Sequence, residues 1–152
     1  MNTYIGNKVI QAKPMTRQEY NTLRGWTVPV DENPADEGYL VEYMDGGQPN
    51  LPGFAGYVSW SPTDVFERAY RKTSAMTFGD ALVMLKAGQR VARAGWNGKG
   101  MWLQFWKPMH TVDLPYIILL YPVGSAPYPV GARVPWLPSQ TDMLAEDWQV
   151  VE

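Results

Sequence analysis

The chain has no cysteine and a single histidine, and these absences remove several classes of site at once. Without cysteine there is no disulfide, no thiolate nucleophile and no cysteine-ligated zinc. His110 cannot build a metal cluster alone, no carboxylate pair has metal-ligand spacing, and no serine lies in a nucleophile-elbow motif with a histidine base nearby. A phosphodiesterase ordinarily needs such a cluster or an equivalent base. We therefore expect a protein that is not an enzyme, without catalytic residue, metal or cofactor, and with His110 in an exposed loop.

The chain also lacks a charge excess and a long hydrophobic run. Its 13 basic and 15 acidic side chains give a formal charge of −2, which provides no general attraction to a nucleic-acid polymer or an anionic membrane. The longest apolar run, residues 116–121, has the length of a strand, whereas a membrane-spanning helix needs about 20 residues. The N-terminus shows no signal-peptide core. These features favour a soluble intracellular protein without nucleic-acid or membrane partners.

Length and composition favour two small domains. The 152 residues suffice for one ordinary domain or two small ones. Residues 71–75 separate the end of one expected helix from the start signal of the next, so a boundary is predicted there. We expect an accessory domain over residues 1–73 and a second domain over residues 76–152. Seven tryptophans and nine tyrosines can fill small cores, and they also supply stacking surface for a ligand.

Three segments carry a helix-start signal, in which a hydroxyl residue precedes a carboxylate by three positions so that the two cap the first turn reciprocally. The pairs are Thr16 with Glu19, Ser61 with Asp64, and Thr77 with Asp80. In the second segment, Pro62 would occupy the first helical position, where its missing N–H costs nothing. After the third segment, Gly88 is a natural helix stop. Each segment is predicted to be a short helix.

Strand signals occupy much of the remaining chain, in segments that are rich in β-branched or aromatic residues and bounded by Gly, Pro or Asn. The segments are residues 4–12, 38–43, 56–60, 90–94, 101–106, 116–121 and 149–151. Residues 29–37 and 45–53 have the composition of loops. The predicted fold class is α+β, with small antiparallel sheets flanked by short helices.

The GWNGKG motif and the strand before it contain several residues that are suited to binding a ligand. Strand alternation places Arg90 and Arg93 on opposite faces, so only one of them can enter a given pocket, and Arg93 is nearer the turn. The glycines beside Trp96 permit close approach of backbone N–H groups to a phosphate. Asn97-Gly98 is equally the strongest short signal for an ordinary hairpin turn. Trp96 would stack on a base or cap the core, and the hairpin and the binding interpretation are compatible.

The next strand, residues 101–106, has two different faces. Trp102, Gln104 and Trp106 share one face, and the apolar residues that alternate with them share the other, which we expect to be the core side. The tryptophan face is amphipathic. It is expected either to lie under a ligand, with Trp102 as a contact, or to pack against a neighbouring subunit, where tryptophan is enriched.

A second polar motif lies near the C-terminus, within VPWLPSQTDMLAEDW. Two prolines stiffen the chain around Trp136, and a row of donors and acceptors follows that suits ribose hydroxyls and base edges. The row consists of Ser139, Gln140, Thr141 and Asp142. Its alternative interpretation is a helix N-terminus capped by a hydroxyl of the row. Asp142 could instead orient Arg93 or pair with the loop of the GWNGKG motif.

Together these motifs resemble a known family. The strings MTFGDALVMLKAGQRVARAGWNGKGMWLQF, from residue 76, and VPWLPSQTDMLAEDWQVVE, at the C-terminus, are similar to those of the small bacteriophage proteins that include the second type of Thoeris anti-defence protein. The resemblance covers residues 76–152. It is specific, because a helix followed by the arginine and glycine motif is combined with the characteristic C-terminal ending.

The resemblance implies a non-enzymatic sponge that binds cyclic nucleotide immune signals, such as glycocyclic ADP-ribose isomers and some cyclic dinucleotides, without cleaving them. It also implies a homo-oligomer, a tetramer or a dimer, with ligand sites at or near the subunit contacts. On these grounds and those above, we expect the ligand-binding residues to be Arg93, Trp96, Asn97, Gly98, Trp102, Trp136, Ser139, Gln140, Thr141 and Asp142. The protein would act in the cytoplasm of the infected bacterial host.

The N-terminal half resembles an extension found on phage and prophage proteins, in segments such as KPMTRQEYNTLRGW and GYVSWSPTDVFERAYR. No activity follows from this likeness, and the extension is expected to be an accessory or oligomerisation domain. The alternative function for the whole chain is a phage protein–protein interaction or structural module with no small-molecule ligand.

Overall fold

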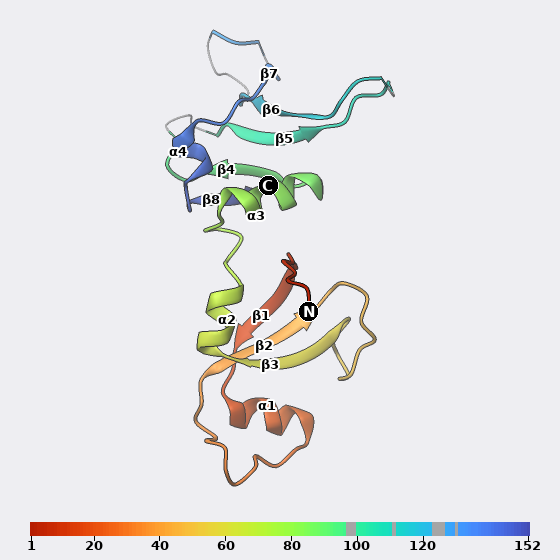
Figure 1. Ribbon diagram of the computed structural model, residues 1–152, viewed down its shortest axis with the longest axis vertical. Helices are drawn as coiled ribbons and strands as arrows, with labels where there is room; N and C mark the ends of the chain where they lie inside the picture. The colour runs from red at the N-terminus through yellow and green to blue at the C-terminus, as the bar shows by residue number, and fades with distance from the viewer. Residues whose placement is uncertain (97–99, 111, 123–126, 130) are drawn as a thin grey trace. The chain divides into compact units, whose positions relative to one another are not determined.

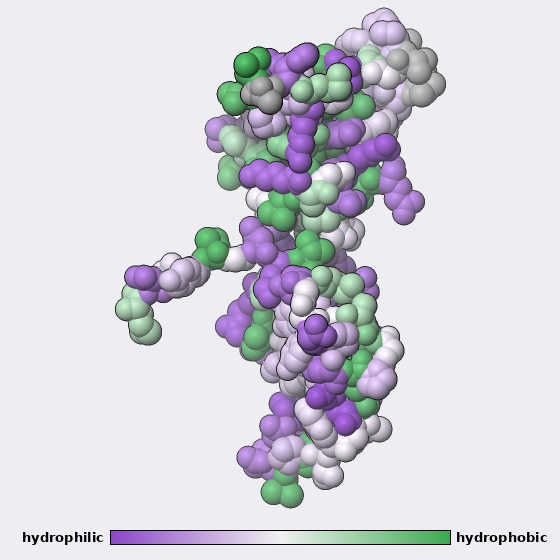
Figure 2. Space-filling model, turned by 90° about the vertical axis from the view of Figure 1, so that its right-hand side faces the viewer, coloured by the Kyte–Doolittle hydropathy of each residue, from purple (hydrophilic) through white to green (hydrophobic). Residues whose placement is uncertain are grey.

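The computed structural model describes residues 1–96, 100–110, 112–122, 127–129 and 131–152. The chain forms two compact units, Met1–Tyr70 and Arg71–Glu152, and each unit has its own antiparallel sheet with short helices (Figure 1). The α+β prediction is therefore confirmed. Apolar and polar residues are interspersed on the side of the units that Figure 2 shows. Among the described residues, no helix combines the length and the apolar character needed to cross a membrane.

The first unit contains a three-stranded sheet in the order β1-β2-β3. Its elements are β1 (Ile10–Pro14), α1 (Arg17–Arg24), β2 (Gly38–Tyr43), β3 (Tyr57–Pro62) and α2 (Thr63–Ala69). Thr16 and Glu19 form the predicted capping box at the start of α1. Tyr20 on α1 packs against Leu40 and Val58 of the sheet, so α1 and the strands share one small core.

Two details of the first unit differ from the prediction. The strand expected from residue 4 begins only at Ile10, because its partner strand β2 ends at Tyr43, which is the residue that pairs with Ile10. The capping box at Ser61 does not form: Ser61 lies inside β3, where it pairs with Tyr39. Pro62 is consequently the residue before α2, and no side chain caps that helix.

The second unit contains a five-stranded sheet in the order β7-β6-β5-β4-β8. Its elements are α3 (Phe78–Lys86), β4 (Arg90–Arg93), β5 (Trp102–Trp106), β6 (Tyr116–Leu120), β7 (Arg133–Pro135), α4 (Gln140–Met143) and β8 (Trp148–Val151). The C-terminal strand β8 pairs with β4, which is the first strand of the unit. Strand β7 was not predicted, because its three residues form no alternating pattern.

Helix α3 packs against β4, β5 and β8 and builds the core of the second unit. Thr77 and Asp80 form the predicted capping box, and Gly88 follows the helix with a φ of 89°, a conformation that suits glycine. Leu85 on the helix packs with Val91 and Leu103 of the sheet, and all three are fully buried. The side of the sheet that faces α3 is called the core face below.

The opposite side of this sheet, called the outer face, carries the tryptophans of β5. Leu103 is buried in the core and Phe105 packs against it, which confirms that the apolar residues of β5 line the core face. By alternation, Trp102 and Trp106 lie on the outer face. Arg90 stacks on Trp102 at 5.2 Å and Arg133 stacks on Trp106 at 4.2 Å, measured from the guanidinium carbon to the ring centroid.

Replacing Leu85 with alanine should destabilise the second unit by about 2–5 kcal/mol, because the side chain is 1 % exposed and its removal leaves a cavity. The free energy of unfolding can be measured by urea titration followed by tryptophan fluorescence. Leu114→Ala is the matched control, since Leu114 is 84 % exposed. An equal loss in both variants would contradict the assignment of this core.

Candidate functional site

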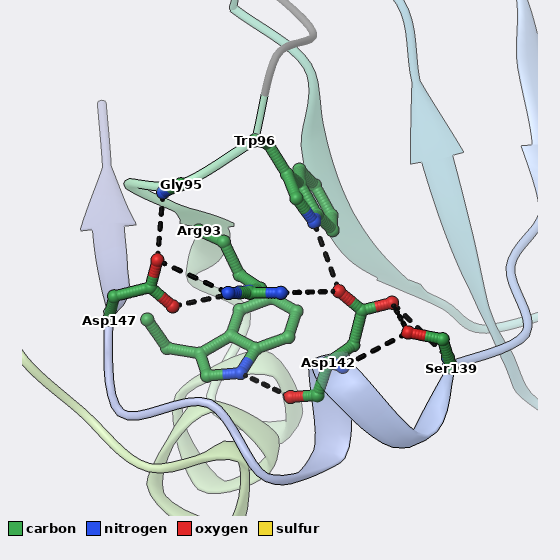
Figure 3. A network of polar contacts seen from close by, with 7 residues as sticks. Arg93, Gly95, Trp96, Ser139, Asp142 and Asp147 are labelled. Carbon is green, nitrogen blue, oxygen red and sulfur yellow. Dashed lines mark hydrogen bonds and ion pairs between the residues drawn. The ribbon is translucent and has the colours of Figure 1, made fainter.

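The candidate site is built around Arg93, the last residue of β4. Its Nε donates to Oδ1 of Asp147 at 2.8 Å, and its Nη2 donates to Oδ2 of the same residue at 3.4 Å. Its Nη1 donates to Oδ1 of Asp142 at 2.9 Å (Figure 3). The pairing of β4 with β8 explains the first contact, because Arg93 pairs with Trp148 and Asp147 directly precedes that residue.

Asp142 accepts four hydrogen bonds with its two carboxylate oxygens. Oδ2 accepts from the backbone N–H and the hydroxyl of Ser139, at 3.2 and 2.7 Å, which completes a capping box at the start of α4. Oδ1 accepts from Arg93 and also from Nε1 of Trp96, at 3.2 Å. The backbone oxygen of Asp142 accepts from Nε1 of Trp148 at 3.0 Å. One residue of α4 is thus bonded to the ends of two strands and to the loop after β4.

Gly95 lies close to this ion-pair network. Its N–H donates to Oδ2 of Asp147 at 2.8 Å. A Cβ at this position would lie 2.8 Å from the same oxygen, a distance that side-chain carbons do not tolerate. A side chain here would push the Asp147 carboxylate away from its contacts with Arg93 and with the Gly95 N–H. The anion that this N–H binds is a carboxylate of the chain itself, which corrects the expectation that Gly95 is free for a phosphate.

The charged groups of the network are partly shielded from water. The side chains of Arg93 and Asp142 are 16 % and 15 % exposed, and that of Asp147 is 34 % exposed. Burial by itself would raise the pKa of Asp142, but hydrogen bonds from Ser139, Arg93 and Trp96 outweigh it and lower the pKa to about 2. The guanidinium of Arg93 lowers the pKa of Asp147. All three groups are ionised at neutral pH, and the trio has one surplus negative charge.

Four aromatic side chains adjoin the network and are called the aromatic cluster below: Phe78, Trp96, Trp136 and Trp148. Trp148 is fully buried at its centre, with ring centroids 5.5 Å from Phe78, 5.5 Å from Trp96 and 5.9 Å from Trp136. Trp96 and Trp136 are only partly buried. The cluster therefore combines a core residue with two rings at the surface of the unit.

The structure brings together five of the ten residues expected to bind a ligand, namely Arg93, Trp96, Trp136, Ser139 and Asp142. Gln140 and Thr141 are exposed in the first turn of α4, so the helix interpretation of this row is confirmed. Trp102 lies on the outer face, whereas Trp96 packs against the core, so the two tryptophans belong to different surfaces. Asn97 and Gly98, including the hairpin turn predicted there, lie outside the described residues.

Two expectations change with this geometry. Arg93 was expected to enter a ligand pocket, but its guanidinium is paired with two carboxylates, and one of them is Asp142, as in the alternative interpretation. Asp147 and Phe78 were not among the site residues expected from the sequence. Asp147 lies 54 residues from Arg93, and only the pairing of β4 with β8 brings the two together. Among the described residues, no group of three or more metal-ligating side chains could hold an ion, and His110 is exposed.

Comparisons with known proteins match the part of the chain that contains these residues. Residues 76–151 match the model of the Thoeris anti-defense 2-like domain. A similar protein is Thoeris anti-defense 2 of Bacillus phage SP01, which is 39 % identical over 88 residues. That alignment covers 50 % of this chain and 94 % of the phage protein. The family match includes the residues of the network and of the aromatic cluster.

Asp142 should make the stability of the protein depend on pH in acid. Its folded pKa of about 2 lies below the ordinary value of 3.8, so its contribution to stability is present above pH 3.8 and is lost as the pH falls towards 2. The wild type should have a higher free energy of unfolding than Asp142→Asn at pH 6. This difference should be smaller by about 2 kcal/mol at pH 2. Urea unfolding at both pH values measures it.

Thr141→Ala is the control for this experiment, because it changes an exposed, non-titrating neighbour in the same helix. Its difference from the wild type should be the same at both pH values. A pH-independent difference for Asp142→Asn as well would show that the carboxylate is not held in the ionised form by the network.

Proposed function

The chain belongs to the Thoeris anti-defense 2-like family through residues 76–151, and we propose that its second unit sequesters a cyclic nucleotide immune signal without cleaving it. The ligands we propose are glycocyclic ADP-ribose isomers, with cyclic dinucleotides as a second class. The observation that supports this proposal is the combination of partly exposed Trp96 and Trp136 with the exposed polar residues at the start of α4.

The chemistry of the aromatic cluster suits the flat parts of such a ligand. The ring centroids of Trp96 and Trp136 are 6.3 Å apart and their planes are inclined by 60°, so the two rings do not form a parallel slot. A base would therefore stack on one ring alone, on the side of that ring turned away from the other tryptophan. The side chains of Ser139, Gln140 and Thr141 offer donors and acceptors for ribose hydroxyls and base edges.

The state of the carboxylates supports binding without cleavage. A general acid or base needs a pKa near the working pH and a free position beside the reacting atom. Asp142 and Asp147 have lowered pKa values and accept hydrogen bonds from Arg93. They are therefore poorly suited to move protons at neutral pH. The same pairing makes Arg93 a weak partner for phosphate, because the trio carries a surplus negative charge.

We also propose that the second unit forms a homo-oligomer, a dimer or a tetramer, through its outer face. Among the described residues, helices α3 and α4 contact residues of the core face, while the outer face carries Trp102, Gln104 and Trp106. The first unit is proposed as an accessory domain, and the site of action as the cytoplasm of the infected bacterium.

Trp96→Ala should weaken the binding of glycocyclic ADP-ribose by about tenfold or more, because it removes a stacking surface for the base. Calorimetric titration measures the affinity. Trp26→Ala is the control, since Trp26 is a 54 % exposed tryptophan of the first unit. The ligand released by denaturing the wild-type complex should be chemically intact. A cleaved ligand would contradict sequestration, and absence of any binding would favour an interaction module.

Gln104→Lys should break the homo-oligomer, because it places a hydrated charge in the middle of the proposed contact. Sedimentation velocity of the wild type and the variant measures the assembly state. Gln89→Lys is the matched control, because Gln89 is an exposed residue between α3 and β4 and does not lie on the outer face. Unchanged sedimentation of Gln104→Lys would place the contact elsewhere.

A further inference from the structure

We propose that Asp142 is a positioning residue that acts through Trp96, fixing the indole in the orientation that a ligand meets, and is not itself a ligand contact. The effect of Asp142 on ligand binding rests on the function proposed above, whereas its effect on the orientation of Trp96 does not. Asp142 reaches the indole from α4, 46 residues further along the chain, and its Oδ1 accepts from Nε1 of Trp96 (Figure 3).

The carboxylate has little capacity left for a ligand. Oδ1 is shared between Arg93 and Trp96, and Oδ2 is shared between the backbone N–H and the hydroxyl of Ser139. The two oxygens of an ionised carboxylate offer about four acceptor positions, so these donors fill them. With the side chain 15 % exposed, a ligand would have to displace an internal partner to reach it.

The indole, in contrast, has few other constraints. Trp96 lies outside the paired residues of β4 and β5, and its backbone N–H donates to the carbonyl of Arg93 at 3.3 Å. Its ring meets Trp136 and Trp148 at inclined angles, contacts that limit the ring but do not specify the direction of its N–H. The hydrogen bond to Oδ1 does specify that direction. A fixed ring also loses less conformational freedom when a base stacks on it.

Asp142→Asn tests this role sharply, because asparagine keeps the shape of the side chain but has only one acceptor oxygen. If that oxygen faces Trp96, the amide N–H₂ meets the N–H of Ser139; if it faces Ser139, the amide meets the donors of Trp96 and Arg93. Ser139→Ala is the matched control, since it removes the hydroxyl cap and leaves Oδ1 with Trp96 and Arg93.

Indole N–H resonances of the ligand-free protein provide a readout that general destabilisation would not produce. The Trp96 resonance, assigned by its loss in Trp96→Phe, should move upfield in Asp142→Asn and stay in place in Ser139→Ala. The Trp148 resonance reports whether α4 stays seated, because its Nε1 donates to the backbone oxygen of Asp142. An unmoved Trp96 resonance in a folded Asp142→Asn protein would overturn the proposal.

A double-mutant cycle with glycocyclic ADP-ribose as the probe tests the link to binding. Asp142→Asn should lower the affinity about tenfold in the wild type and less than about threefold in Trp96→Phe, which lacks the N–H. Equal losses in both backgrounds would identify Asp142 as a direct contact and refute positioning. If wild type binds no probe, the proposed function fails, and the resonance shift alone decides the role of Asp142.

If Asp142→Asn does not fold, Trp96→Phe decides the question, because it removes the donor of the hydrogen bond, together with one ring of the indole, and keeps a smaller aromatic ring for stacking. If Asp142 positions Trp96 through that bond, Trp96→Phe should bind glycocyclic ADP-ribose about tenfold more weakly than the wild type. The indole N–H resonance of the neighbouring Trp136 or Trp148 should also shift in this variant. Wild-type affinity in Trp96→Phe would overturn the proposal.

Discussion

The second unit depends on the ion-pair network of one arginine and two aspartates. Arg93 ends β4, Asp147 precedes β8 and Asp142 lies in α4, so the network connects three elements that are far apart in the sequence. Removing Arg93 would leave two partly buried carboxylates without their shared cation, whereas removing either aspartate would leave Arg93 with one partner. The same network gives Trp96 and Gly95 their hydrogen-bond acceptors. Folding and the proposed binding surface therefore rely on the same few contacts.

The sheet of this unit separates two surfaces with different chemistry. The core face carries α3, the aromatic cluster and the network, and its exposed edge is where we propose that a nucleotide binds. The outer face carries Trp102 and Trp106, each stacked with an arginine. Because alternate residues of β5 point to opposite faces, one short strand supplies both the core and the proposed subunit contact.

Much of the fold could be predicted from local patterns. The capping boxes of α1 and α3 and the strand β2 were found at their residues, because a cap needs only a hydroxyl and a carboxylate three positions apart. The box at Ser61 failed because pairing with Tyr39 kept that residue in β3. The strand expected before Ile10 failed because no partner extends beyond Tyr43. Tertiary pairing overrode local preference in both cases.

The sequence by itself determined the residue types of the site and the family of residues 76–151, because motif spacing and side-chain chemistry are local properties. It also determined that Trp96 and Asp142 are important candidates. Only the tertiary structure decided which residues they contact. The pairing of β4 with β8 brings Asp147 to Arg93, and the capping box of α4 turns Asp142 towards Trp96. Whether a charged residue meets a ligand or an internal partner depends on such long-range contacts, which spacing along the chain does not encode.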